Sequence, residues 1–358
     1  MLERFKVPAK DRVYVPADKA RAATEAVFRH ACLDDEGAKQ SADVLITNDL
    51  RGVESHGISN QLRNYLRMYG EGTLNAQPEF KIVRETTTTA LMDSDGALGI
   101  HAAPTAMRLA IKKAKEHGTG TVALVGAGHL GGAGYHASLA AQENMIGQAM
   151  AGPGGKQTLP TFGAEPRFGT HPIAWAAPAR NNPPFLFDIA TTQVAGNKIQ
   201  LAKRVGADLE PAWIAGDDGE PILDRVPVPD EYFQLPFGGT RENSSHKGYG
   251  MMAMIDIMCN SMTGVGAGFL TGGGGQMFVA TNIEAFIDLD DYFDWVDKFL
   301  DGLRNTKPAK GHDRVLYPGL SEWEETEERS KNGIPYHREV VEWFESYAAE
   351  VGVEVDLR

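Results

Sequence analysis

A histidine inside a glycine-rich run is the first candidate for chemistry. His129 lies in the run Gly-Ala-Gly-His-Leu-Gly-Gly-Ala-Gly, residues 126–134, between a predicted strand over 121–125 and a predicted helix over 135–143. An imidazole has a pKa near neutrality, so it can exchange a proton with a substrate oxygen while hydride moves at the neighbouring carbon. The alternative is a structural histidine that is hydrogen-bonded near a helix start.

The same run matches the dinucleotide fingerprint G-x-G-x-x-G through Gly126, Gly128 and Gly131. In a Rossmann unit the next strand ends on an acid that holds the adenosine ribose. Here the strand predicted over 145–150 continues into a stretch without acids, residues 151–155, and Glu143 lies before it. His129 would also crowd the pyrophosphate. We therefore predict that the glycines pack the backbone closely around a ligand and present His129.

Four other segments combine glycines or prolines with reactive side chains. They are 52–58 with His56 at a helix entrance, 169–173 with His171, 187–192 with Asp188 at a strand end, and 246–250 with Lys247; a fifth, Tyr317-Pro318-Gly319, comes late in the chain. These segments are spread over most of the sequence. The fold must therefore bring them together if they form one site.

Hydrophobic periodicity predicts the elements that position these segments. Helices are expected over 16–50, with Asp18 and either Asp34 or Asp35 as caps, and again after residue 57. A hairpin over 80–83 and 89–92, a helix over 100–117 and alternating strands and helices up to residue 150 predict an α/β layer. Further strands are expected over 173–177, 185–189 and 276–280, and a Met-rich helix over 247–262.

Bulk composition restricts the class of protein. The 358 residues are 42% hydrophobic and 23% charged, and the net charge of −13 argues against nucleic acid or an anionic membrane as partner. No run of about 18 apolar residues and no signal peptide is found. Cys32 and Cys259 lie in apolar, helix-like surroundings and are expected to be buried thiols. A cytoplasmic protein is predicted.

Taken together and in this order, the segments resemble the malate/L-lactate dehydrogenase family, which also contains sulfolactate, ureidoglycolate and diketogulonate dehydrogenases and piperideine-carboxylate reductases. The resemblance extends from about Ala17 to Tyr317. It implies a mixed-sheet, non-Rossmann α/β fold that binds NAD or NADP, with NAD favoured, and a homodimer. It also implies a helical domain of residues 1–75 and 283–358 beside an α/β domain of residues 76–282.

The resemblance assigns roles to matching positions. Either His56 or His129 would be the proton donor or acceptor, and Asp188 would orient a histidine or the nicotinamide, unless it is only a turn aspartate. Lys247 would contact cofactor hydroxyls or phosphate, unless it is a solvated cation. The cofactor would be lined by Asp188, Ile189, Ala190, Thr191, Lys247, Gly248, Pro318, Gly319, Leu320 and Ser321.

Three positions depart from the family pattern. Many members have an arginine where this chain has Asn60, so Arg63 is expected to take the substrate carboxylate. His171 replaces an asparagine, and His246 replaces a residue that is often apolar or Pro. No histidine spacing indicates zinc, so no metal is expected. The predicted function is hydride transfer between NAD(P) and a small 2-hydroxy or 2-oxo acid. Alternatives are a cyclic imino acid reductase, a Rossmann dehydrogenase and a non-catalytic ligand-binding protein.

Overall fold

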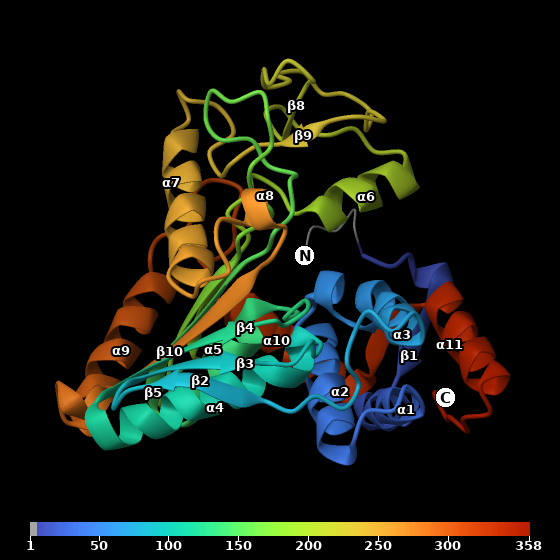
Figure 1. Ribbon diagram of the computed structural model, residues 1–358. Helices are drawn as coiled ribbons and strands as arrows, with labels where there is room; N and C mark the ends of the chain where they lie inside the picture. Colours follow the sequence, from blue (N-terminus) through green and yellow to red (C-terminus); the bar gives the residue numbers. More distant parts are fainter. Residues whose placement is uncertain (1–5) are drawn as a thin grey trace.

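The computed structural model describes residues 6–358, apart from the side chains of residues 204 and 205. A seven-stranded mixed sheet forms the centre, in the order β2-β3-β4-β10-β5-β6-β7 (Figure 1). Its strands are β2 (Lys81–Glu85), β3 (Thr89–Asp93), β4 (Thr119–Val125), β10 (Gly275–Asn282), β5 (Met145–Gly152), β6 (Ile173–Ala177) and β7 (Phe185–Ile189).

Strand β10 decides the fold class. It lies between β4 and β5 and runs antiparallel to both, with Met277 opposite Ala123 on one side and Met150 on the other. In a Rossmann unit the strands that flank the first helix are parallel and adjacent. The predicted mixed-sheet, non-Rossmann α/β fold is therefore confirmed, and a Rossmann dehydrogenase is excluded.

Helices cover both faces of this sheet. On one face, the fully buried Val122, Leu124 and Phe278 pack with α4 (Gly99–His117) and α5 (Ala133–Gln142). On the other face, Ala123, Met150 and Met277 pack with residues of α7 (Ser245–Asp256) and of the π-helical turn that follows it. Successive residues of a strand point to opposite faces, which gives one sheet two cores.

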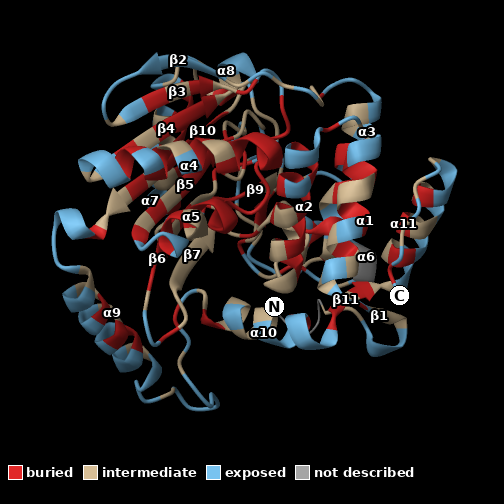
Figure 2. Cartoon of the chain, turned by 90° about the horizontal axis from the view of Figure 1, so that it is seen from below, coloured by how far each residue is buried: buried red, intermediate tan, exposed pale blue. Residues whose placement is uncertain are grey.

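A third core lies beside the sheet. It joins α1 (Ala17–His30), α2 (Asp35–Leu50), α3 (Arg63–Gly70) and the C-terminal α11 (Arg338–Glu350) with the two-stranded pair β1 (Arg12–Val15) and β11 (Ile334–His337). Figure 2 shows the buried faces of α1, α2 and α11 turned toward one another. The N- and C-terminal segments thus share one hydrophobic cluster.

The remaining helices and strands lie at the margins. They are α6 (Gly196–Val205), β8 (Ile214–Ala215), β9 (Phe233–Gln234), α8 (Gly268–Thr271), α9 (Leu289–Arg304) and α10 (Leu320–Asn332). Helix α10 packs on α2, whereas α9 lies at the opposite end of the molecule from α11 (Figures 1 and 2). The division into two domains at the predicted boundaries stays a prediction.

Two local expectations need correction. Asp34 caps α2 as predicted, since its carboxylate accepts a 2.7 Å hydrogen bond from the Gly37 amide, but Asp18 lies inside the first turn of α1, which begins after Pro16 without a side-chain cap. Cys259 is buried, whereas Cys32 is exposed just after α1. Across residues 6–358, no helix is both long and apolar enough to cross a bilayer.

Candidate active site

A cavity of about 1010 Å³ collects most of the predicted site residues. Its volume is at the upper end of the range for small-molecule sites, roughly 300–1,000 Å³, and suits a dinucleotide together with a small acid. The predicted residues that line it are His56, His129, Asp188, Ile189, Ala190, Pro318, Gly319 and Ser321. Segments separated by more than 250 residues in the sequence therefore meet in one site.

The glycine run holds His129 by close packing against the protein itself. The Gly128 amide donates to Ala97 O at 2.8 Å, and the Ile100 amide donates to His129 O at 3.2 Å. Gly131 has φ of +73°, and a Cβ there would lie 2.8 Å from Ile100 Cγ2. The glycines that were expected to pack closely around a ligand thus also pack closely against the start of α4.

The N-terminus of α5, where a Rossmann fold would bind pyrophosphate, is already filled. The Gly134 amide donates to Asp188 Oδ2 at 2.7 Å, and a Cβ on Gly134 would lie 2.7 Å from the same oxygen. A helix N-terminus attracts anions through its free N–H groups and its dipole. Here the anion is a carboxylate from the end of β7, so the fingerprint glycines have no phosphate to bind at this point.

The two candidate histidines lie face to face. Their rings stack at 5.5 Å between centroids with an interplanar angle of 22°. Tyr65 Oη lies 2.6 Å from His129 Nδ1, and Ser55 Oγ lies 2.8 Å from His56 Nδ1. Both Nδ1 atoms are therefore engaged, which leaves each Nε2 for a ligand.

Burial determines the charge of this pair. It lowers the pKa of His129 to about 3, helped by repulsion from His56, and it lowers the pKa of His56 to about 4. Both rings are therefore neutral at pH 7. A neutral imidazole can accept a proton. Two protonated rings stacked this closely would repel each other, so protonation of both at once is disfavoured.

One face of the helix after His56 lines the cavity, and it includes neither Asn60 nor Arg63. Residues 58–62 form a π-helical turn that runs into α3, and the cavity is lined by Gln61, Asn64, Tyr65 and Met68. A π turn accommodates an extra residue and changes which side chains share a face. Gln61 was missed because this turn gives no signal in a single sequence.

Asn60 and Arg63 point away from the cavity. The Asn60 amide donates to Glu54 O at 2.7 Å. Arg63 pairs with Glu339 at 3.1 Å and lies 4.6 Å from the centroid of the Trp343 ring. Their positions do not support the substrate-binding roles expected of them.

Five other predicted residues lie outside the cavity lining. His171 is buried with Nε2 3.1 Å from Asp256 Oδ2, and Thr191 Oγ1 donates to His171 O at 2.9 Å. Leu320 belongs to a hydrophobic cluster, and Gly248 packs on the backbone of Phe237. Lys247 is exposed in the first turn of α7.

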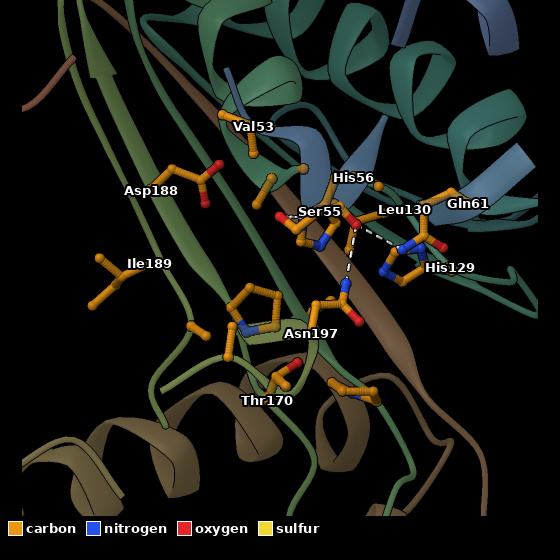
Figure 3. Close-up of a pocket in the computed structure, with 18 of the residues that line it drawn as sticks. Val53, Ser55, His56, Gln61, His129, Leu130, Thr170, Asp188, Ile189 and Asn197 are labelled. Atoms are coloured by element: carbon orange, nitrogen blue, oxygen red, sulfur yellow. Dashed lines mark hydrogen bonds between the residues drawn. The ribbon is translucent and has the colours of Figure 1, made fainter. Parts of the chain in front are cut away.

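Polar residues that the sequence did not single out complete the wall. Gln61 Nε2 and Asn197 Nδ2 both donate to Ser55 O, at 2.9 and 3.0 Å (Figure 3). Arg51 also lines the cavity, and burial lowers the pKa of its guanidinium while it raises the pKa of Asp188. Within the described side chains, no three His, Cys, Asp or Glu residues cluster closely enough to hold a metal ion.

Known structures share this architecture. Malate dehydrogenase from Pyrococcus horikoshii superposes with a TM-score of 0.89, covering 98% of this chain and 99% of that one. Sulfolactate dehydrogenase from Methanocaldococcus jannaschii superposes with a TM-score of 0.85 at 31% identity, covering 96% and 98%. The fold and the cavity thus define a dehydrogenase of the mixed-sheet, non-Rossmann class.

Sequence comparison places the chain within that class. The Pyrococcus horikoshii enzyme is 34% identical over 362 residues, 96% of each chain, and ureidoglycolate dehydrogenase (NAD(+)) from Escherichia coli K12 is 31% identical over 299 residues, 81% and 82% of the two chains. The family model described as malate/L-lactate dehydrogenase matches residues 15–345. The chain belongs to the malate/L-lactate dehydrogenase family, as the resemblance implied.

Proposed function

We propose that the protein is an NAD-dependent oxidoreductase that interconverts a small 2-hydroxy acid and its 2-oxo acid. The observation that carries this proposal is the stacked pair of neutral histidines in a cavity large enough for cofactor and substrate. The names of the relatives, malate, sulfolactate and ureidoglycolate dehydrogenase, support the substrate class.

The cavity suits a nicotinamide dinucleotide. Its wall contains apolar and backbone surface from Ile189, Ala190 and residues 316–319, together with an unpaired guanidinium nitrogen of Arg51. When bound, the cofactor supplies the hydride acceptor or donor. NAD is favoured over NADP because a 2′-phosphate usually requires its own arginine, and Arg51 is the one Lys or Arg of this wall among the side chains described.

We assign the proton transfer to His129 Nε2. In the oxidation direction the neutral ring accepts the proton of the substrate hydroxyl, while the hydrogen bond between Tyr65 and Nδ1 fixes the ring plane. In the reduction direction the same nitrogen returns the proton to the carbonyl oxygen. Burial disfavours the charged form of His129 and thereby helps the protonated ring to release its proton.

A spectrophotometric screen tests this function. Purified protein is incubated with NADH or NADPH and with oxaloacetate, pyruvate, a sulfonated 2-oxo acid or a cyclic imino acid, and absorbance is followed at the reduced-nicotinamide band. Oxidation of NADH by a 2-oxo acid supports the proposal. Turnover of the imino acid alone would replace the proposal with a cyclic imino acid reductase. Tight NADH binding without any turnover would replace it with a non-catalytic ligand-binding protein.

We further propose that the chain forms a homodimer in the cytoplasm. Met254, Ile257, Met262 and Leu270 leave exposed apolar surface on and near α7, and such surface is typical of interfaces between subunits. Light scattering of the purified protein measures the assembly directly. A mass of one chain at micromolar concentration would contradict the dimer.

A further inference from the structure

Arg51 is a cation without a partner in the wall of the active site. It directly follows α2 and starts the loop that carries His56. Among the side chains described for residues 6–203 and 206–358, no other Lys or Arg lines the cavity, and no ion pair or side-chain hydrogen bond joins Arg51 to a carboxylate. Its Nη1 is buried and has no hydrogen-bond partner.

The two carboxylates nearest Arg51 form no hydrogen bond with it. Asp188 and Glu322 both interact with it through space, but Asp188 Oδ2 already accepts the Gly134 amide at 2.7 Å, and Glu322 Oε2 accepts a hydrogen bond from Ser321 Oγ at 2.9 Å. A Cβ built on Gly134 would lie 3.2 Å from Arg51 Nη1, so this donor lies beside the start of α5.

A buried guanidinium nitrogen without a hydrogen-bond partner lowers the stability of the folded protein unless a ligand pairs with it. A buried donor without an acceptor costs about 1–3 kcal/mol, and more when it is charged. Buried polar groups are nearly always paired, and the exceptions call for an explanation such as a missing ligand. Gln61, the side chain of the π-helical turn that faces the cavity, is neutral, and Arg51 is the one Lys or Arg among the described side chains of the wall.

We propose that Arg51 binds an oxyanion of the bound ligands, either the carboxylate of the 2-oxo acid or a phosphate of the dinucleotide. This assignment rests on the proposed function, which brings both kinds of oxyanion into the cavity. Guanidinium N–H groups match the geometry of both, since two donors can bind two oxygens of one carboxylate or phosphate. It also transfers the anchoring role expected of Arg63 to a residue that lines the site.

Binding measurements on Arg51→Met test the proposal without relying on turnover. Dissociation constants are measured for NADH, for NADPH, and for oxamate, an unreactive carboxylate analogue of a 2-oxo acid, in the presence of NADH. Loss of a charge-assisted hydrogen bond weakens binding about 10- to 100-fold. Arg51→Lys, which keeps the charge, recovers part of the loss, and Arg180→Gln, which removes an exposed arginine paired with Asp290, changes nothing.

The pattern of loss identifies the oxyanion. Weaker oxamate binding with unchanged NADH assigns the substrate carboxylate. Equal weakening of NADH and NADPH assigns the pyrophosphate, and weakening of NADPH alone assigns the 2′-phosphate. Dissociation constants within about twofold of wild type for all three ligands would overturn the site.

Two controls separate this result from other failures. The ligand-free Arg51→Met protein is expected to fold, since Arg51 forms no hydrogen bond or ion pair with another described side chain, and its melting temperature shows any folding defect. If wild-type protein itself fails to bind NADH, the proposed function is wrong. If wild type binds normally and the variants do too, only the Arg51 site is wrong.

Discussion

The two loops that present the histidines are held in place by opposite means. The loop over 51–57, with His56, is held by buried charges: Arg329 pairs with Glu54 at 2.9 Å and donates to Asp49 O at 2.7 Å. The loop over 126–132, with His129, is held by backbone packing against α2 and α4. There, a Cβ on Gly132 would lie 2.6 Å from Asn48 Oδ1.

This difference shows two ways to fix a reactive side chain in one cavity. Steric packing has no charge to titrate, so the position of His129 does not depend on pH through its supports. The supports of His56 are ionisable, and burial raises the pKa of Asp49 to about 7. Measurements of the unfolding free energy and of its pH dependence in variants of each loop therefore distinguish the two kinds of support.

The largest expected effect comes from Arg329→Met. It leaves Glu54 buried without its cation, which costs about 3–5 kcal/mol of unfolding free energy. Arg314→Met is the matched control, since that exposed pair with Glu324 contributes about 1 kcal/mol or less. Urea unfolding measures both, and equal losses would show that the charges around Glu54 are not special.

A smaller loss is expected from Gly131→Ala. The residue has φ of +73°, and the new methyl group would meet Ile100 Cγ2 at 2.8 Å, so strain and overpacking together cost about 2–4 kcal/mol. Gly302→Ala in the last turn of α9 has free space and is expected to stabilise by up to about 1 kcal/mol. Should Gly131→Ala unfold like wild type, packing does not hold the His129 loop.

The third effect is one of pH. The pKa of Asp49 is raised in the folded state, so its contribution to stability is complete below about pH 4 and is lost as pH rises through about 7. Asp49→Asn keeps an oxygen for the Ile58 amide and the Tyr336 hydroxyl but removes this titration. The difference in melting temperature, Asp49→Asn minus wild type, should therefore be more positive at pH 8 than at pH 5. The loss in Gly131→Ala should be the same at both pH values.

Much of the fold was predictable from local sequence. The strands Ile173–Ala177 and Phe185–Ile189 match their predicted ranges because each is a short apolar run bounded by Pro, Gly or polar residues. The family resemblance implied a mixed sheet, but nothing in the sequence placed β10 between β4 and β5. Pairing between strands more than 100 residues apart leaves no local pattern.

The active-site residues were predictable only in part, because local sequence shows residue types and strand ends but not tertiary contacts. Glycine context and strand ends singled out His129 and Asp188, but the bond from the Gly134 amide to Asp188 is a tertiary contact that spacing cannot show. The family resemblance assigned Lys247 to the cofactor, yet it lies outside the cavity lining. Arg63 was expected to bind the substrate carboxylate, whereas Gln61 of the π-helical turn lines the cavity, and no residue type marks such a turn.

The most direct test of the account is a comparison of His129→Ala with wild type in two measurements, the turnover of NADH with a 2-oxo acid and the dissociation constant of NADH. Removal of a general acid–base group is expected to lower kcat by about 10²- to 10⁴-fold, while NADH binding stays within twofold. His56→Ala should lose less. Near-normal kcat in His129→Ala, or a larger loss in His56→Ala, would contradict the assignment of the proton to His129.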